Sequence, residues 1–470
     1  MRELLRFGGV ATGCLEQRFS RLMVHASGTG KSVEVRVVSQ RRQRVVGTWR
    51  SISLGVVLVV LACSVAAVGQ GTIRFGDRNL EEAVREAIFK TSGTLYDYDV
   101  SWLTHLNADR RGISDLGGLA ECSSLITVDL AANEISSISE LGQLEYLHEA
   151  NLAANSIGIL SPLRGLDHLE MLVLDGNPVT DIAPLEDLVT LELLRLRDCN
   201  VSSLEPLRGL IFLEHLAVSC QAGTDLSPLQ GLVDLELLFV EADSALNLAI
   251  LGRMEDLKVL GLASVTVTDF TPLRYLGDLE GVYLKDVDGV NTHIEQLLDA
   301  QPGLTSLGFE SLSFDRFTAL TGFEGLESLQ LVDVGFTDLG ILVEFHRLQS
   351  LDLSENGLSE VGLLAELRGI RSLDVSGNEI ASLQAVEPIT TLRTLDISGN
   401  PVTSLEPLWK MRDLETLRMS STDVSDIAVL LRLTKLAYVD LRDTPISLSA
   451  GSAALSVIEA LEQDGVTVDR

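Results

Sequence analysis

A repeat of 22 residues runs through most of this chain, and it restricts the fold more than any other feature of the sequence. Each unit opens with Leu or Ile and follows the pattern Leu-x-x-Leu-x-Leu-x-x-Asn, with other apolar residues replacing leucine in places. Only the unit that begins at Leu279 is longer, with 25 residues. The units begin at Leu103, Leu125, Leu147, Leu169, Leu191, Leu213, Leu235, Leu257, Leu279, Leu304, Leu326, Leu348, Ile370, Leu392, Leu414 and Leu436. One unit cannot bury its apolar residues alone, so the units must stack into a solenoid.

The unit at 392–413 shows what each repeat is expected to build. Leu395 and Ile397 alternate with polar residues, which predicts a short strand with one buried face. We expect these strands to stack in parallel. The apolar residues of the return segment face inward, and 22 residues leave room for a 3₁₀ or extended return rather than a full α-helix. Together these features predict an α/β solenoid of the leucine-rich-repeat type.

A column of asparagines is expected at the corner that follows each strand. There the side-chain amide can bond backbone groups that would otherwise be buried without a partner. The column consists of Asn133, Asn155, Asn177, Asn356, Asn378 and Asn400. Between its two runs stand Val265, Val287, Leu312 and Val334. We expect apolar packing to compensate at these positions, and a functional hinge is the alternative.

The return segments resemble those of a known family. DIAPLEDL at 181–188 and SLEPLRGL at 203–210 are similar to the short repeats of bacterial internalins. The resemblance implies a right-handed leucine-rich-repeat horseshoe with a concave parallel sheet, an N-terminal helical cap and a C-terminal cap of helix and strand. It also implies an adhesin-like or complex-forming protein, although the wall-anchoring signals and additional modules of many internalins do not occur here.

Both caps have sequence signals. In FGDRNLEEAVREAI at 75–88, Asn79 and Glu82 suit a capping box, and an apolar stripe formed by Leu80, Val84, Ala87 and Ile88 would cover the first strand. At 452–468 an amphipathic helix ends at Gly465 and a short strand follows. The predicted boundaries are 1–51 for a basic N-terminal region, 52–69 for a signal peptide or anchor, 70–102 for the N-terminal cap, 103–446 for the repeats and 447–470 for the C-terminal cap.

The uncharged apolar segment at 52–69 predicts export. Four arginines, at 41, 42, 44 and 50, precede it on the side that should remain cytoplasmic. Small residues at its end suit cleavage before Val68 or Gln70, and retention as a single anchor is the alternative. We expect the true start to lie downstream of Met1, near Met23 or later. The predicted location is therefore the periplasm, the cell surface or the medium.

Charge narrows the range of partners. Ten of the 36 Lys and Arg and three of the 67 Asp and Glu lie within residues 1–69, so residues 70–470 carry 26 basic and 64 acidic side chains, a net charge near −38. Such a field repels nucleic acid and anionic lipid, which leaves the apolar N-terminal segment as the expected membrane contact. The five cysteines are too scattered for a disulfide framework and are expected to be buried free thiols.

The concave face is the usual binding surface of a solenoid. The third, fifth and seventh residues of each unit should lie on it, and in the units from Leu191 to Leu279 several are large and apolar or basic. The predicted partner-binding cluster consists of Arg195, Arg197, His215, Leu237, Phe239, Glu241, Val259, Tyr283 and Lys285. Such a cluster on an acidic molecule is typical of a binding hot spot, and packing beneath a loop is the alternative.

Two other features are expected to be structural. Asp352, Asp374, Asp396 and Asp440 share the fifth position, where we expect solvated carboxylates rather than a calcium site, because calcium needs six to eight oxygens that converge on one point. Residues 291–303 predict a helical turn or two on the convex side, with Thr292 and Glu295 as its cap.

No catalytic constellation is present in the sequence. The seven histidines are scattered, no Ser lies in a nucleophile elbow, and no His pair has metal-ligand spacing, so we expect no enzymatic activity, no catalytic residues, no metal and no cofactor. The leading hypothesis is binding of a protein partner through the concave face. Glycan binding is an alternative that would need flat aromatic platforms, for which Phe239, Tyr283 and Tyr438 are available. A cytoplasmic regulatory scaffold is a third, if the apolar segment is not an export signal.

Overall fold

The computed structural model describes residues 71–470, which fall into two units. The described part of the first unit is small, comprising residues 71–73 and 94–97, in which Thr72 forms an antiparallel bridge with Tyr96. The second unit contains residues 74–93 and 98–470 and holds all the repeats. The predicted N-terminal region and the export segment at 52–69 lie outside the described residues.

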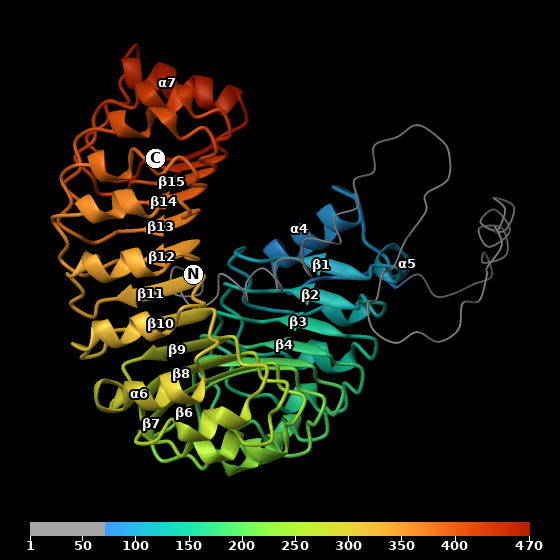
Figure 1. The fold of residues 1–470 in the computed structure, drawn as a ribbon. Helices are drawn as coiled ribbons and strands as arrows, with labels where there is room; N and C mark the ends of the chain where they lie inside the picture. Colours follow the sequence, from blue (N-terminus) through green and yellow to red (C-terminus); the bar gives the residue numbers. More distant parts are fainter. Residues whose placement is uncertain (1–70) are drawn as a thin grey trace, which may run out of the picture. The chain divides into compact units, whose positions relative to one another are not determined.

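The second unit is a solenoid with one strand per repeat. Each of its 17 strands pairs in parallel with its neighbours in the sequence, so the sheet grows in chain order (Figure 1). The strands are β1 (His105–Asn107), β2 (Thr127–Asp129), β3 (Glu149–Asn151), β4 (Met171–Val173), β5 (Leu193–Val201), β6 (His215–Cys220), β7 (Leu237–Ala245), β8 (Val259–Thr266), β9 (Gly281–Lys285), β10 (Ser306–Glu310), β11 (Ser328–Val332), β12 (Ser350–Asp352), β13 (Ser372–Asp374), β14 (Thr394–Asp396), β15 (Thr416–Arg418), β16 (Tyr438–Asp440) and β17 (Thr467–Asp469).

The return segments form the outer, convex layer. Most contain a short 3₁₀ helix, as 22 residues require, and the sheet lines the inner side of the arc (Figure 1). The 3₁₀ helices are η1 (Leu119–Glu121), η2 (Ser139–Gln143), η3 (Ser161–Leu163), η4 (Ala183–Leu185), η5 (Glu205–Leu207), η6 (Ser227–Gly231), η7 (Leu248–Leu251), η8 (Thr271–Tyr275), η9 (Phe317–Gly322), η10 (Leu339–Glu344), η11 (Gly362–Glu366), η12 (Gln384–Val386), η13 (Glu406–Lys410) and η14 (Ala428–Arg432). The expected leucine-rich-repeat horseshoe is confirmed.

Four α-helices occur in the described part: α4 (Arg78–Ala87), α5 (Asp97–Val100), α6 (Val290–Ala300) and α7 (Ala453–Gln463). Helix α4 packs against β1, and α7 packs against β17 and η14, so a helix covers each end of the core. Ser452 caps α7 by accepting a hydrogen bond from Leu455 N at 3.1 Å, and Gly465 has φ +86° where the chain turns into β17. Both predicted caps are therefore present.

Two predicted helix starts are wrong. Asp77 rather than Asn79 caps α4, because its carboxylate accepts hydrogen bonds from Asn79 N at 2.7 Å and Leu80 N at 3.3 Å. The buried stripe of this helix accordingly includes Ala83 and not Ala87. Helix α6 accommodates the three inserted residues and begins after Gly289, whose left-handed φ of +95° and missing side chain replace the expected cap at Thr292 and Glu295.

The asparagine column is confirmed at all six positions. Asn133 represents the pattern: its Oδ1 accepts from Ile113 N at 2.9 Å, and its Nδ2 donates to the carbonyls of Ala108 and Leu130 at 2.9 Å. Each amide thus joins two consecutive repeats at the corner where the chain leaves the strand. Buried amides of this kind supply partners for backbone groups that packing alone would leave unsatisfied.

The strands are longer where asparagine is missing. Strands β5, β7 and β8 continue past the corner, and Val201 pairs with Cys220 and Ala245 with Thr266 beyond a break in register. Of the four apolar residues that interrupt the column, only Val265 lies within a lengthened strand. Val287, Leu312 and Val334 lie beyond the ends of β9, β10 and β11 and are buried, as expected for compensating apolar packing.

Within residues 71–470 no helix has both the length and the apolar character needed to cross a membrane.

Candidate functional site

The concave surface changes character along the solenoid. In β4 to β8 the third residue of each repeat is Met171, Leu193, His215, Leu237 and Val259, and strand register places these five residues side by side. The fifth residues of β4 to β6 are Val173, Arg195 and Ala217. We call these eight residues the central concave patch.

The same positions are polar in the later repeats. From β10 to β15 the third residues are Ser306, Ser328, Ser350, Ser372, Thr394 and Thr416, again in register. The buried side of the strands is leucine-rich throughout, so apolar residues on the concave side of β4 to β8 are not needed for the fold. Leu237 and Val259 remain partly exposed, whereas Met171 is 5% and Leu193 3% exposed.

The ring of Phe239 lies flat across a glycine. A Cβ atom at Gly261 in the neighbouring strand would lie 2.5 Å from Cδ2 of Phe239, so the absent side chain makes room for this ring. The Arg197 guanidinium stacks on the ring at 4.3 Å from its centroid. Phe239 is 6% exposed, and the expectation that it stands free on the concave face is wrong.

Tyr283 is held in the same way. A Cβ atom at Gly308 would lie 2.5 Å from Cδ1 of Tyr283, and the Tyr283 hydroxyl is 2.5 Å from Oγ of Ser306. Burial raises the pKa of this hydroxyl, an effect that the hydrogen bond with Ser306 partly offsets. Tyr283 is 3% exposed, so it too fills the surface between strands rather than projecting from it.

The basic residues of the predicted cluster contact acidic neighbours. Arg195 forms an ion pair of 2.5 Å with Asp175, and Lys285 one of 3.1 Å with Glu310. Asp175 also accepts a hydrogen bond from Arg197 N at 2.8 Å. The Nε of Arg195 is buried without a hydrogen-bond partner, which is uncommon for a guanidinium N–H.

Glu241 belongs to a hydrogen-bonded chain along the rim of the patch. It accepts from Ser219 Oγ at 2.6 Å, and Ser219 Oγ accepts from Asp198 N at 3.0 Å. His215 and Val259 lie in the third-position row described above. Four predicted residues therefore lie together on one surface: Arg195, His215, Leu237 and Val259. Phe239 and Tyr283 are packed between neighbouring strands. Glu241 and Lys285 lie at the margin of the surface.

Sequence reasoning missed five residues of this surface. Leu193 and Ala217 lie in units that were considered, on β5 and β6. Met171, Val173 and Asp175 lie on β4 and its end, one repeat before the first of those units. They occupy the third, fifth and seventh positions of the unit from Leu169, so the same positional rule finds them.

The aspartates that share the fifth position accept hydrogen bonds from the backbone. Asp352, Asp374 and Asp396 align in β12 to β14, and each accepts a hydrogen bond from the backbone N–H two residues later, at 3.0 Å, 2.9 Å and 2.9 Å. They are therefore not merely solvated, because they bond the chain where each strand ends. Burial, with the charge of Asp374 beside it, raises the pKa of Asp396 to about 6.

Three cysteines lie in the described residues, and all are free thiols. Burial raises the pKa of Cys122 to about 12, of Cys199 to about 11 and of Cys220 to about 12, which suppresses the thiolate that reactive chemistry needs. Cys199 occupies an asparagine position, and its Sγ lies 3.5 Å from the carbonyl of Leu174.

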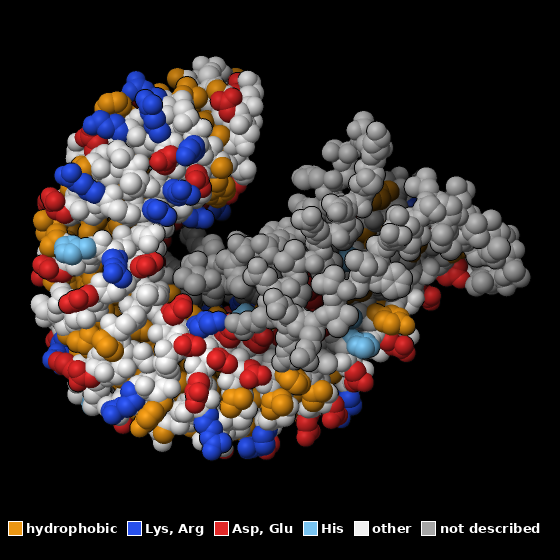
Figure 2. All heavy atoms as spheres, turned by 45° about the vertical axis from the view of Figure 1, so that its right-hand side comes forward, with side chains coloured by type: hydrophobic (Ala, Val, Ile, Leu, Met, Phe, Trp, Pro, Cys, Tyr) orange, Lys and Arg blue, Asp and Glu red, His pale blue; other side chains and the backbone are white. Residues whose placement is uncertain are grey.

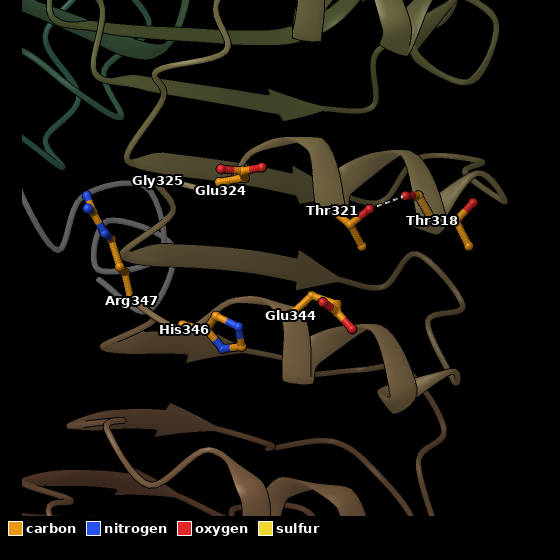
Figure 3. Close-up of a pocket in the computed structure, with 7 residues that line it drawn as sticks. All are labelled: Thr318, Thr321, Glu324, Gly325, Glu344, His346 and Arg347. Atoms are coloured by element: carbon orange, nitrogen blue, oxygen red, sulfur yellow. Dashed lines mark hydrogen bonds between the residues drawn. The ribbon is translucent and has the colours of Figure 1, made fainter.

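An open hollow of about 860 Å³ lies outside the concave face, beside η9, η10 and the loops that follow them. Figure 3 shows its residues, with Arg347 at one end and Thr318 at the other. It is lined by Thr318, Thr321, Glu324, Gly325, Glu344, His346 and Arg347. Thr321 Oγ1 donates to the carbonyl of Thr318 at 2.9 Å, and no catalytic pairing joins the acidic and basic groups that line it. Across residues 71–470 no group of His, Cys, Asp and Glu has a metal-binding arrangement.

Comparison with known proteins agrees with this architecture. A family profile described as leucine-rich repeats (two copies) matches residues 390–430, which contain β14, η13 and β15. The chain has a leucine-rich-repeat fold. Among curated proteins no significant match was found.

Several solved leucine-rich-repeat structures are similar to this solenoid. An internalin, InlF, from Listeria monocytogenes is 20% identical over 84% of this chain and 95% of its own, with a TM-score of 0.36. The functional domain of InlJ from the same organism is 17% identical over 80% and 82%, with a TM-score of 0.46. A leucine-rich-repeat protein of Leptospira interrogans is 19% identical over 78% and 95%, with a TM-score of 0.41. The match to the leucine-rich-repeat profile agrees with the repeat type that the sequence predicts.

Proposed function

We propose that this leucine-rich-repeat protein is a non-catalytic recognition protein that binds a protein partner through the central concave patch. One observation carries the proposal: five consecutive repeats place Met171, Leu193, His215, Leu237 and Val259 in a row where later repeats place Ser or Thr. Leu237 and Val259 are partly exposed on the solvent side of the sheet, whereas Met171 and Leu193 are buried beside them. Exposed apolar residues of this kind are typical of interaction surfaces. The leucine-rich-repeat fold itself supports a role in protein interaction.

A protein fits this patch better than a glycan does. Glycan recognition would use exposed aromatic faces, but Phe239 and Tyr283 are buried. The third candidate, Tyr438, is partly exposed, and its ring contacts Arg418. An aliphatic row instead suits apolar side chains of a protein, and Arg195 beside it is already paired with Asp175. The acidic character of residues 70–470 argues against a nucleic acid as the partner.

Export is a separate part of the proposal, and it rests on the sequence. The apolar segment at 52–69 and the arginines before it are the features that support it. Fractionation of cells that express a tagged full-length chain, with or without residues 52–69, tests this. Export that needs the segment supports the proposal, whereas a chain that remains cytoplasmic in both forms favours the intracellular scaffold.

The binding test compares two matched variants. Leu237→Asp places a charge in the central concave patch, and Ser328→Asp places the same charge at the third position of β11. Each would serve as bait beside the parent chain in envelope and host-surface extracts. We expect Leu237→Asp to reduce capture of the parent's partner at least tenfold, as for a hot-spot residue, and Ser328→Asp to leave capture unchanged.

Equal capture by both variants would place binding elsewhere on the molecule. If the parent retains no protein but binds a glycan array, the glycan alternative replaces this proposal. Unfolding midpoints of the variants are the folding control.

A further inference from the structure

The loops that lead into the strands form one continuous lateral surface. The second residue of each repeat links to its counterpart in the next repeat through backbone hydrogen bonds; Glu192 N, for example, donates to Glu170 O at 2.8 Å, and Arg393 N donates to Arg371 O at 2.8 Å. We call this surface the leading edge. It comprises the last two residues of each repeat and the second residue of the next.

The first half of the leading edge is acidic. Asp234, Asp256 and Asp278 end three consecutive repeats, and all three are exposed. Glu170, Glu192, Glu214 and Glu236 occupy the second position of four consecutive repeats. Between β3 and β10 this surface carries one basic side chain, Lys258, which pairs with Glu236 at 2.8 Å.

The second half of the same edge has more basic than acidic side chains. Its exposed basic residues are Arg347, Arg368, Arg371, Arg393, Arg412 and Lys435. Glu324, Glu327, Asp413 and Glu415 lie on the same half, and Asp413 pairs with Lys435 at 2.7 Å. Arg368, Arg371 and Arg412 take part in no ion pair within residues 71–470, and Arg393 has only a long contact of 3.7 Å with Glu415. In Figure 2, Lys and Arg side chains are frequent on the part that carries the last repeats, at the upper left, and Asp and Glu are frequent along the lower part.

We propose that the leading edge binds the leading edge of a second copy of this chain, in an antiparallel dimer with two-fold symmetry. A two-fold axis across the middle of the edge places the acidic half of each copy opposite the basic half of the other. Such an interface is self-complementary, because the same surface serves both partners. The proposal uses none of the concave residues and is independent of the proposed function.

A basic strip on a strongly acidic molecule is the feature that needs an explanation. An acidic strip that spans a similar number of repeats lies on the same edge. The basic strip of one copy can therefore pair with the acidic strip of a second copy. At about 5 Å per repeat, the edge between β3 and β16 is roughly 65 Å long, enough for an interface of standard size. Exposed Val189, Ile211, Phe212 and Val233 add apolar area at the end of three consecutive repeats.

The first test is the mass of the full-length chain as a function of concentration and salt, measured by analytical ultracentrifugation. We expect a dimer at low ionic strength. It should dissociate in about 1 M NaCl, where the Debye length is about 3 Å. A chain that remains monomeric at low salt over the whole concentration range would overturn the proposal.

Two charge-reversal variants identify the surface. Arg368→Glu with Arg412→Glu reverses two charges of the basic half, and Asp234→Arg with Asp256→Arg reverses two charges of the acidic half. Each variant alone should dimerise at least tenfold more weakly than the parent, because like charges then meet. An equimolar mixture of the two should form a heterodimer, since every reversed charge again faces an opposite one.

Arg78→Glu with Arg470→Glu is the matched control, because it changes the net charge equally and lies at the ends of the chain away from the leading edge. It should dimerise like the parent. A dimer that survives the Arg368 and Arg412 reversals, or two weakened variants that fail to associate when mixed, would show that the leading edge is not the interface. If one variant does not fold, the salt dependence of dimerisation by the parent chain still tests the proposal.

Discussion

At the scale of single residues, each buried asparagine stabilises the solenoid by bonding several buried backbone groups. Asn378 Nδ2 donates to the carbonyls of Leu353 at 3.0 Å and Val375 at 2.8 Å, while its Oδ1 accepts from Leu358 N at 2.9 Å. Alanine would leave these backbone groups buried and unpaired. We expect Asn378→Ala to lower the free energy of unfolding by about 3 kcal/mol in chemical denaturation.

Asn107→Ala is the control for this measurement, because Asn107 is exposed and lies outside the column. Its effect should stay within about 0.5 kcal/mol. A similar loss in both variants would mean that the column has no special role.

Asp396 should make stability depend on pH. Burial and the neighbouring Asp374 raise its folded-state pKa to about 6, above the ordinary value of 3.8. A group with a raised pKa contributes stability that is complete below the unfolded-state pKa and is lost as pH rises through the folded-state pKa. Relative to the parent, Asp396→Asn should therefore be more stable at pH 8 by up to about 3 kcal/mol and equal at pH 4. A stability difference that does not change between these pH values would contradict the assignment.

At the scale of elements, adjacent strands fit each other through glycine and aromatic pairs. A methyl group at Gly308 would collide with the ring of Tyr283 and displace the hydroxyl from Ser306. We expect Gly308→Ala to cost about 1 to 3 kcal/mol, as overpacking does. Gly277→Ala is the control, since no atom lies within 4 Å of its added carbon, and it should be neutral. Equal melting temperatures for the two variants would contradict this fit.

Two carboxylates join helix α4 to the first repeat, because Asp77 bonds Ser114 and Glu86 pairs with Arg111 at 2.7 Å. Asp77 caps the helix and also accepts hydrogen bonds from Ser114 N at 3.0 Å and Ser114 Oγ at 3.3 Å. Asp77→Ala should cost about 1 to 2 kcal/mol and speed hydrogen exchange in α4, whereas Asp77→Asn, which keeps an acceptor oxygen, should cost less. Unchanged exchange in Asp77→Ala would show that packing alone holds the helix.

The sequence predicts elements whose signal is periodic and misses those that depend on a neighbouring strand. The strands and the 3₁₀ returns follow from the 22-residue spacing, and both caps follow from the amphipathic patterns of their helices. The capping-box spacing of Asn79 and Glu82 predicts a helix start at Asn79, whereas Asp77, two residues earlier, caps α4. The lengthened strands β5, β7 and β8 have no local signal, since only the missing asparagines in adjacent repeats allow the added pairs.

At the scale of the whole molecule, the concave face and the leading edge are two different surfaces. Repeat position was enough to place Arg195, His215, Leu237 and Val259 on the concave face from the sequence. It could not show that the rings of Phe239 and Tyr283 are buried, because that depends on glycines one repeat further along, at 261 and 308. The expected cluster of apolar and basic residues therefore lacks its two exposed aromatic rings.

Site-specific photocrosslinking tests the central claim most directly. A photoreactive residue would replace Leu237 in the full-length chain, and Ser328 in the control, before exposure to the extract that contains the partner. The account predicts that Leu237 crosslinks to the same protein that the parent captures and that Ser328 does not. Crosslinks of equal yield from both positions, or none from Leu237 while capture persists, would contradict binding through the central concave patch.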